Sequence, residues 1–315
     1  MRRAHHLSAV LLLLAVWLFA QPAHAADRLD ATPRTLLMTA YAPEFNALIP
    51  FVKAAEEHDL NGMTLVTGEL EGKPVLLMQS GVSMVNAAMN TQLALDHFAI
   101  ERIVFSGIAG GVDPSLSIGD ILVAESWGQY LEVSFARWTK DGWVPPEPID
   151  PAAPKNWEFM FPRGVRLGNG AEPSARHFTF AVDPHLLETA RKVASSVEMQ
   201  RCVEGSSTAL PGSELCLPSA PRIFIGGTGV SAGVFADNAQ FREYLRKAWG
   251  ARVLDMESAA VAQVAYANQV SAIFIRSLSD LAGGDHGKNM EDTYEHLASV
   301  NSARFTRAFL AALPN

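Results

Sequence analysis

The chain has 315 residues, of which 49% are hydrophobic and 18% are charged, and its formal net charge is −8. This length suffices for one sizeable α/β core or two small ones, and the composition argues against extended disorder. Because binding to a nucleic-acid backbone requires clustered Lys and Arg, the negative charge argues against nucleic-acid partners.

The first 25 residues have the pattern of a signal peptide. Two arginines precede an apolar run at residues 11–20, and the tripeptide AHA at 23–25 places small residues where a signal peptidase reads them. The pattern predicts cleavage before Ala26 and a periplasmic or secreted protein. An uncleaved membrane anchor is the alternative, but the apolar run is short for a bilayer span. We expect no membrane contact after cleavage.

Short apolar runs alternate with amphipathic segments along the rest of the chain. Strands are predicted at residues 35–40, 63–70, 74–79, 102–106, 121–125, 223–225, 253–254 and 271–276. Helices are predicted at residues 45–57, 84–97, 184–194, 235–248, 257–267 and 292–313. Glu71-Gly72 predicts a hairpin turn. The alternation indicates one α/β domain, residues 35–315, with a mixed, mainly parallel twisted sheet flanked by helices.

Two stretches depart from this alternation. Between Trp127 and about Ala175 the periodicity fails and Pro, Gly and Trp become frequent, which predicts a long insertion acting as a lid or interface element. Cys202 and Cys216, the only cysteines, bracket a stretch rich in Ser, Gly and Pro. In an exported protein this spacing favours a structural disulfide. Neither CxxC spacing nor a His cluster accompanies them, so we expect no metal site there.

Three acidic residues follow predicted strands closely: Glu44, Glu257 and Asp280. Ligands of α/β sheets bind where the strands end, so these carboxyls predict a single catalytic crevice. The alternative is structural, with Glu257 capping its helix and Asp280 pairing with Arg276. The glycine cluster at 107–111 lets the backbone approach a ligand closely. It is neither GxGxxG nor a P-loop, so no dinucleotide or ATP is inferred.

Two segments resemble signature regions of 5′-methylthioadenosine/S-adenosylhomocysteine nucleosidases and related nucleoside phosphorylases. They are SGIAGGVDPSLSIGDILVAES at 106–126 and VLDMESAAVAQVAYANQVSAIFIRSLSD at 253–280. The resemblance extends from about Thr35 onward and is weakest in the insertion. It implies a nucleoside phosphorylase-like fold and an enzyme that cleaves the N-glycosidic bond of purine nucleosides. It also makes a homodimer the default assembly, and it implies no metal or organic cofactor.

The resemblance assigns roles to individual residues. Glu44 matches the acid that positions or deprotonates the attacking water, and Asp280 matches the acid that protonates purine N7. The implied substrate-binding residues are Ile108, Ala109 and Gly110 in the ribose and nucleophile pocket, Met256 and Glu257 at the ribose hydroxyls, and Ser279 beside Asp280.

Four apolar residues are candidates with less specific roles. Val230 and Phe235 are candidates to enclose the base, with helix packing as the alternative for Phe235. Phe178 and Phe180 are candidates to act from a partner subunit or to belong to the strand core. The segment GGTGVSAGVFADN at 226–238, together with the cysteine pair and the signal peptide, is more similar to the secreted plant storage proteins of the same superfamily.

The absence of Arg from two segments predicts the nucleophile. The stretches TAYAPEFNAL and GGVDPSLSIGD correspond to the phosphate loops of phosphorylases, and neither contains Arg. A phosphate dianion beside Glu44 and Asp113 would be repelled, so we predict hydrolysis. The alternatives are a phosphate-dependent purine nucleoside phosphorylase and a non-catalytic nucleoside-binding or storage protein. Retention of all three acids speaks against the latter, because a binding protein needs no acid at N7.

Overall fold

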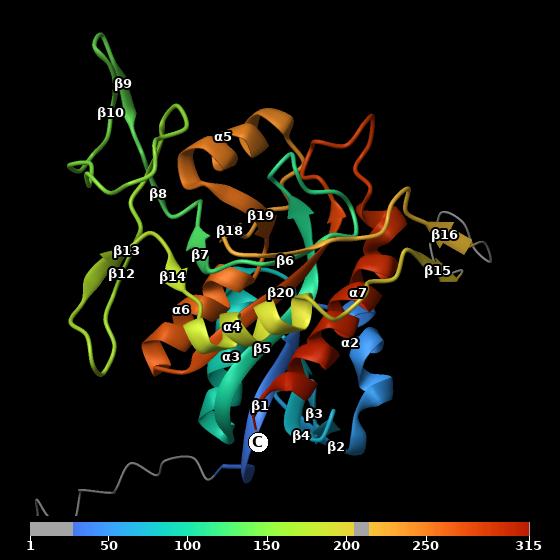
Figure 1. Ribbon diagram of the computed structural model, residues 1–315. Helices are drawn as coiled ribbons and strands as arrows, with labels where there is room; N and C mark the ends of the chain where they lie inside the picture. Colours follow the sequence, from blue (N-terminus) through green and yellow to red (C-terminus); the bar gives the residue numbers. More distant parts are fainter. Residues whose placement is uncertain (1–27, 205–213, 315) are drawn as a thin grey trace, which may run out of the picture.

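The computed structural model describes residues 28–204 and 214–314, and Figure 1 shows their arrangement. The chain forms a central sheet of 12 strands with helices packed on both faces. The predicted signal peptide lies outside the described residues. In the part of the chain that is described, no helix combines the length and the apolar character needed to cross a membrane.

Strands and helices alternate along the chain. The strands of the central sheet are β1 (Asp30–Thr39), β2 (Lys53–Leu60), β3 (Met63–Leu70), β4 (Lys73–Gln79), β5 (Phe98–Gly111), β6 (Ile121–Val123), β7 (Ser126–Gln129), β14 (Phe180–Ala181), β17 (Ile223–Ile225), β18 (Thr228–Ser231), β19 (Ala251–Asp255) and β20 (Ser271–Asp280). The helices are α2 (Ala42–Leu48), the 3-10 turn η1 (Ile49–Phe51), α3 (Met84–His97), α4 (Pro184–Ala194), α5 (Ala239–Trp249), α6 (Ser258–Asn268) and α7 (Glu291–Ala312). The strands outside the sheet are β8 (Val133–Phe135), β9 (Arg137–Thr139), β10 (Gly142–Val144), β11 (Met160–Pro162), β12 (Val165–Leu167), β13 (Ala175–His177), β15 (Cys202–Glu204) and β16 (Glu214–Cys216).

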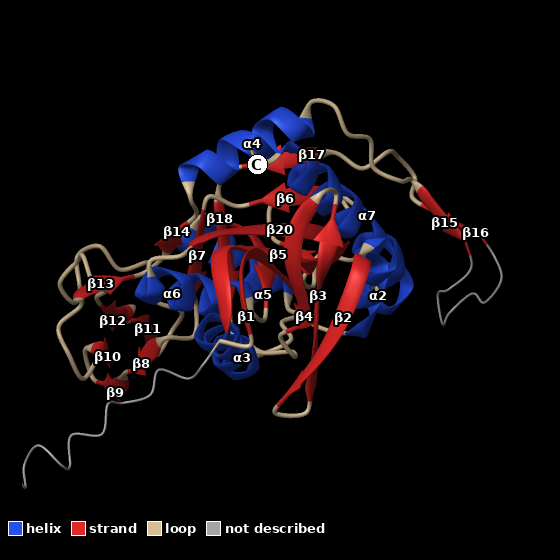
Figure 2. Cartoon of the chain, turned by 90° about the horizontal axis from the view of Figure 1, so that it is seen from below, coloured by secondary structure: helices blue, strands red, loops and turns tan. Residues whose placement is uncertain are grey.

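Parallel strands form the centre of the sheet. Strand β1 pairs in parallel with β4 and β5, and β5 pairs in parallel with β20. Residues 35–39 of β1 and 272–280 of β20 are all buried, as expected for strands covered on both faces. Helices α2, α4 and α7 cover one face of the sheet, and α3 and α6 cover the other (Figure 2). The predicted fold class, mixed α/β with flanking helices, is confirmed.

Several predicted elements have the predicted bounds, namely the helices at 84–97 and 184–194 and the strand at 223–225. The predicted hairpin is also confirmed: β3 and β4 are antiparallel, and Glu71 and Gly72 between them both have positive φ. Positive φ at both central residues is the requirement of a two-residue type I′ turn.

The predicted helix at 45–57 is wrong beyond its first part. Helix α2 ends at Leu48, η1 follows, and residues 53–60 form β2, which pairs antiparallel with β3. The sequence KAAEEHDL has good helix formers, but pairing along β3 overrides that local preference. The helix predicted from Phe235 begins at Ala239, because the side chain of Asn238 caps its N-terminus.

The chain leaves the sheet after β7 and returns at β14, forming a projection that we call the outer arm, residues 130–179 (Figure 1). Its strands pair only with one another, as β8 with β11, β9 with β10, and β12 with β13. The ring of Trp157 packs against Phe241 and Tyr244 of α5 and attaches the arm to the body. Trp127, where the predicted insertion begins, is fully buried within β7.

The predicted disulfide is confirmed. Cys202 and Cys216 are bonded across the antiparallel pair β15–β16, while residues 205–213 between them lie outside the described part. The side chain of Asn301 in α7 accepts a hydrogen bond from the Gln200 N–H and donates one to the Gln200 carbonyl. The base of the disulfide hairpin is therefore fixed to the long C-terminal helix.

Candidate active site

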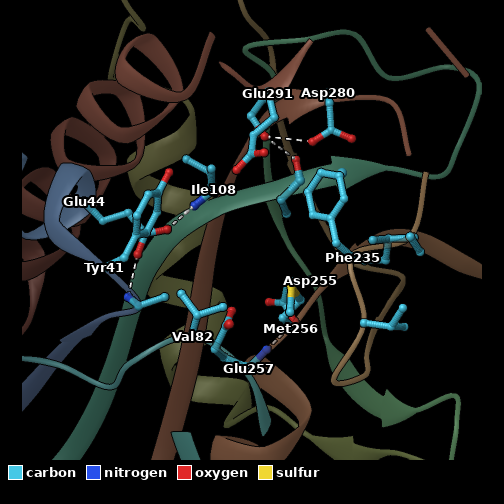
Figure 3. Close-up of a pocket in the computed structure, with 17 residues that line it drawn as sticks. Tyr41, Glu44, Val82, Ile108, Phe235, Asp255, Met256, Glu257, Asp280 and Glu291 are labelled. Atoms are coloured by element: carbon cyan, nitrogen blue, oxygen red, sulfur yellow. Dashed lines mark hydrogen bonds between the residues drawn. The ribbon is translucent and has the colours of Figure 1, made fainter. Parts of the chain in front are cut away.

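A cavity of about 210 Å³ lies where β5, β19 and β20 end (Figure 3). The predicted site residues that line it are Glu44, Ile108, Ala109, Gly110, Phe235, Met256, Glu257, Ser279 and Asp280. The further lining residues are Ala40, Tyr41, Val82, Val234, Ala236, Leu254, Asp255 and Glu291. The structure thus gathers side chains that are as far apart in sequence as α2 and α7.

The pairing of three strands explains this convergence. Ile108 and Ala109 of β5 lie opposite Ser277 and Leu278 of the parallel strand β20. Gly110 lies opposite both β19 and Asp280 of β20. Because β5 and β20 are parallel and end at the same edge, the glycine turn and the acid after β20 meet there.

Glu44 lies in the first turn of α2 with its side chain buried. Its Oε1 accepts a hydrogen bond from the Ile108 N–H at 2.8 Å, and its Oε2 accepts one from the Ala40 N–H. Burial raises the pKa of this carboxyl, and the Arg276 guanidinium and the backbone donors oppose the rise. A carboxylate with a raised pKa beside a cavity is suited to accept a proton from water.

We call Glu44, Asp255 and Glu257 the floor of the cavity. Arg276 lies beneath this floor and is fully buried. Its Nε is 2.8 Å from Asp255 Oδ2, its Nη1 is 4.0 Å from Glu44 Oε1, and its Nη2 is 3.9 Å from Glu257 Oε2. Its guanidinium carbon also lies 4.1 Å from the centre of the Phe105 ring. One cation therefore serves three buried carboxyls, which would be costly to bury without it.

Gly107 of β5 provides the space for this arrangement. A Cβ at this position would collide with Arg276 Nη1 and with Glu44 Oε1. Close approach of the guanidinium and the carboxyl over the strand therefore requires glycine here.

Asp255, at the end of β19, caps helix α6. Its Oδ1 accepts hydrogen bonds from the N–H groups of Glu257 and Ser258, at 3.2 and 3.1 Å. Its carboxylate also accepts from the hydroxyls of Ser231 and Ser258. Glu257 occupies the N-cap position but its own side chain makes no capping bond. The capping alternative for Glu257 is therefore wrong, and its carboxyl is free to face the cavity.

The Glu257 carboxyl is held from the opposite side by a loop. Its Oε1 accepts a hydrogen bond from the Ser83 N–H at 2.8 Å. Ser83 has φ +86°, a strained conformation for a residue with a side chain. Burial, and next the neighbouring Asp255 charge, raise the pKa of Glu257, while Arg276 opposes the rise. The carboxyl is thus fixed in position beside Val82, at the end of the cavity away from Asp280 (Figure 3).

Asp280 ends β20 and is buried at the far side of the cavity from Glu257 (Figure 3). Its Oδ2 accepts a hydrogen bond from the Ser279 hydroxyl at 2.9 Å, and its Oδ1 accepts from the Ala282 N–H at 2.8 Å. Arg276 makes its ion pairs with the three floor acids, so the alternative pairing of Arg276 with Asp280 is wrong. Asp280 therefore has no cationic partner among the described residues.

Three polar lining residues were not singled out from the sequence: Tyr41, Asp255 and Glu291. Asp255 stands directly before Met256-Glu257, where an acid ahead of a helix is a recognisable capping signal. Glu291 is the first residue of α7, 11 positions after Asp280, and only the packing of α7 brings it to the cavity. Burial, followed by the charges of Asp280 and Glu295, raises the pKa of Glu291 to about 7.

Other candidates lie away from the cavity. Val230 is fully buried in a separate apolar cluster beside α5, and Phe178 packs against that cluster. Phe180 belongs to the main core. Asp113 forms an ion pair with Arg252 at 2.8 Å instead of facing the cavity.

Metal-binding potential is confined to one place in the described ranges. There, the potential ligand atoms of Cys202, Glu214 and Cys216 lie close together, but the sulfurs are bonded to each other and do not act as thiolate ligands. At the cavity, the described lining residues include five acids and neither Lys nor Arg. These acids, in distinct environments around a cavity of about 210 Å³, are equipped for proton transfer on both sides of a bound molecule.

The sequence model of the phosphorylase superfamily matches residues 34–314. The chain belongs to this superfamily. The predicted resemblance to its 5′-methylthioadenosine/S-adenosylhomocysteine nucleosidases is confirmed by sequence relatives of that name. The enzyme of Mycobacterium bovis is 29% identical over 248 residues, covering 79% of this chain and 84% of the relative. The enzyme of Shewanella denitrificans is 27% identical over 277 residues, covering 88% and 98%.

Solved structures of this superfamily share the fold. The 5′-methylthioadenosine/S-adenosylhomocysteine nucleosidase of S. pneumoniae, bound to a transition-state inhibitor, has a TM-score of 0.64 at 19% identity and covers 89% of this chain and 100% of its own. Futalosine hydrolase of Helicobacter pylori has a TM-score of 0.64 at 20% identity, covering 89% and 98%. At these identities the likeness shows that the overall fold is shared.

Proposed function

We propose that the protein is a purine nucleosidase, which hydrolyses the N-glycosidic bond of nucleosides of the methylthioadenosine and S-adenosylhomocysteine type. The observation that carries this proposal is the placement of Glu44, Glu257 and Asp280 around one cavity. The relatives named for this activity match most of the chain, which supports the same reaction type.

Each acid has a role that follows from its surroundings. Glu257, fixed by the Ser83 N–H, accepts hydrogen bonds from the ribose hydroxyls and orients the sugar. Glu44 takes a proton from water as the water oxygen bonds to C1′. The electron pair of the C1′–N9 bond goes to the base, and protonated Asp280 gives its proton to N7. Such general acid assistance contributes roughly 10²–10⁴-fold to the rate.

Water is favoured over phosphate by the charge of the cavity. Its described lining contains carboxyls and no Lys or Arg, and the buried Arg276 is already surrounded by three acids. A phosphate dianion would enter a region of net negative charge. Asp113 pairs with Arg252, so the repulsion of phosphate comes from Glu44 and the other acids of the cavity and not from Asp113.

The assembly and location are part of the same proposal. Val82 at the cavity and Val85 and Met89 on α3 are exposed by 44%, 77% and 58%, an apolar surface suited to a second copy in a homodimer. The signal-like segment and the Cys202–Cys216 disulfide support a periplasmic or secreted location. Sedimentation of the mature chain and of Met89→Lys tests the dimer, and the variant should shift toward monomer.

The proposed activity is tested by base release from methylthioadenosine, S-adenosylhomocysteine, adenosine and inosine, with and without phosphate. We expect release that does not depend on phosphate. Release only with phosphate would show a phosphorylase. A folded protein that releases no base would show a binding or storage function instead.

A further inference from the structure

One wall of the cavity takes no part in the proposed chemistry. We call it the outer wall: Tyr41, Val82 and Glu291, which come from the start of α2, the loop before α3 and the start of α7. Figure 3 shows Glu291 projecting into the cavity on the side of Tyr41 and Asp280. Glu291 belongs to α7, a helix that no sequence motif connects with the site.

The outer wall faces the remaining substituent of the sugar. In the proposed reaction, C1′ and the base lie toward Glu44 and Asp280, and the ribose 2′ and 3′ hydroxyls lie toward Glu257. The one other substituent of the ring is the C5′ group. Among the lining residues without a role in the proposed reaction or in the floor, the polar ones, Tyr41 and Glu291, lie in the outer wall, and we place the C5′ group there. Glu291 supplies the charged or hydrogen-bonding group of that wall.

The Glu291 carboxyl is free to bind a ligand. Within the described part of the chain, none of the residues donates a hydrogen bond to this carboxyl or forms an ion pair with it. The backbone N–H of Glu291 donates to Asn289 Oδ1, and that bond does not involve the carboxyl. The Tyr41 hydroxyl is engaged elsewhere, since it donates to Glu295 at 3.1 Å. Glu291 therefore faces the cavity half-buried with its hydrogen-bonding capacity unused.

A hydroxyl matches this carboxyl better than an apolar group does. With its pKa raised to about 7 by burial and by the charges of Asp280 and Glu295, Glu291 exists in both protonation states near neutral pH. A hydroxyl both donates and accepts hydrogen bonds, so it satisfies either state. An apolar 5′ substituent would desolvate the carboxyl without replacing the lost water contacts.

We propose that Glu291 is a specificity-determining residue that binds the free 5′-hydroxyl of ordinary purine nucleosides and disfavours substrates with an apolar 5′-alkylthio group. This inference rests on the proposed purine nucleosidase reaction and changes its preferred substrate from a methylthioadenosine-type nucleoside to an ordinary purine nucleoside. This substrate preference would differ from that of relatives named for methylthioadenosine. A site that hydrogen-bonds a substrate hydroxyl rejects the analogue that lacks it, and because Glu291 is half-exposed we expect a preference of roughly tenfold to hundredfold.

The test compares kcat/KM for adenosine, 5′-deoxyadenosine and methylthioadenosine. The wild-type enzyme should prefer adenosine over both others by about tenfold or more. Glu291→Leu should lose that preference by a fall in the adenosine value, and Glu291→Gln should keep part of it, because the amide still hydrogen-bonds. Asp292→Leu is the matched control: it removes one acid from the same helical turn at an exposed position and should leave the ranking unchanged.

The outcomes separate this inference from the function on which it rests. Equal or faster hydrolysis of 5′-deoxyadenosine and methylthioadenosine by the wild type would overturn the inference and leave the nucleosidase intact; this ranking needs no variant to fold. If the wild type hydrolyses nothing, the nucleosidase fails, and calorimetric binding of adenosine against 5′-deoxyadenosine decides the role of Glu291. Equal affinities would then overturn it, and tighter binding of adenosine that is lost in Glu291→Gln or Glu291→Leu would support it.

Discussion

The cavity floor and the outer arm represent two ways of ordering a polypeptide. At the floor, Glu44, Asp255 and Glu257 surround the fully buried Arg276, and each acid accepts hydrogen bonds from fixed backbone or hydroxyl donors. In the arm, short strands pair locally, and Phe135 and Trp138 are exposed by 65% and 68%.

The difference shows where the fold depends on exact placement. A buried charge that loses its partner costs several kcal/mol, so the floor has little freedom to rearrange. The aromatic groups of the arm contact one another edge to face, as Trp138 does with Trp143, and remain in reach of water. Substitutions at the floor should therefore change both catalysis and folding, whereas those in the arm should change neither strongly.

The largest expected effect is that of Asp280→Asn. The amide keeps the shape of the side chain but has no acidic proton for N7, so kcat should fall by roughly 10²–10⁴-fold with ligand affinity largely kept. Steady-state kinetics together with calorimetric binding of a substrate measure the two effects. Turnover near that of the wild type would remove Asp280 from the mechanism.

Next in size is Gly107→Ala, which places a methyl group against Arg276 and Glu44. Overpacking of this kind costs about 1–3 kcal/mol, and displacement of Glu44 should also lower kcat. Gly142→Ala in the arm is the control: it has open space around it but φ +104°, so it should lose about 1 kcal/mol from backbone strain and keep full activity. Denaturant unfolding and kinetics of both variants provide the comparison, which equal losses of activity would contradict.

Glu291→Gln, on the outer wall, should change how stability depends on pH. The wild-type carboxyl has a pKa raised to about 7 in the folded protein by burial and by the nearby Asp280, Glu295, Asp292 and Glu44 charges. The unfolded chain releases this proton at lower pH, near 4.3, so wild-type stability falls as pH rises through that interval.

The Gln variant has no proton to lose there. Its Tm relative to the wild type should therefore rise between about pH 4.3 and 7, the interval between the unfolded and folded pKa values, and then level off. Thermal melts across the pH range measure it, with Asp292→Asn on the same turn as a charge control. A difference in Tm that is constant with pH would show that Glu291 ionises alike in both states.

The smallest effect is expected for Trp138→Ser in the arm. The side chain is mostly exposed, and substitutions at such positions usually change stability by within about 0.5 kcal/mol. Activity toward a purine nucleoside should be unchanged. A large loss of kcat would show that the arm takes part in the site and would remove the contrast with the floor.

The sequence predicted the site best where chemistry and strand ends coincide. Glu44, Glu257 and Asp280 each follow a buried apolar strand. The strands before Glu44 and Asp280, β1 and β20, both run parallel to β5 and so end at one edge of the sheet, whereas β19, before Glu257, meets the end of β5 by antiparallel pairing. The same logic does not place Val230, which precedes α5 and faces the second apolar cluster. Its direction depends on the pairing of β18 between β7 and β19, which the residues themselves do not reveal.

The other features that the sequence did not predict depend on contacts between segments that are distant in the chain. KAAEEHDL has the composition of a helix, and its strand conformation arises from pairing with β3. Glu291 reaches the cavity because α7 packs along β5 and β20, so its position follows from tertiary packing instead of local pattern. Tyr41 adjoins a recognised motif, but its bond to Glu295 joins residues 254 positions apart.

The floor carries more negative than positive charge, and this excess affects which species of the proposed reaction it stabilises. Three carboxyls share the single positive charge of Arg276. Without a bound cation, the enzyme is therefore more stable when protons remain on these carboxyls. A ribosyl group that becomes cationic as its glycosidic bond breaks would offset part of this excess negative charge. In the proposed reaction, the short-lived sugar cation is thus the species that the floor stabilises, and a neutral nucleoside gains less from the same charges.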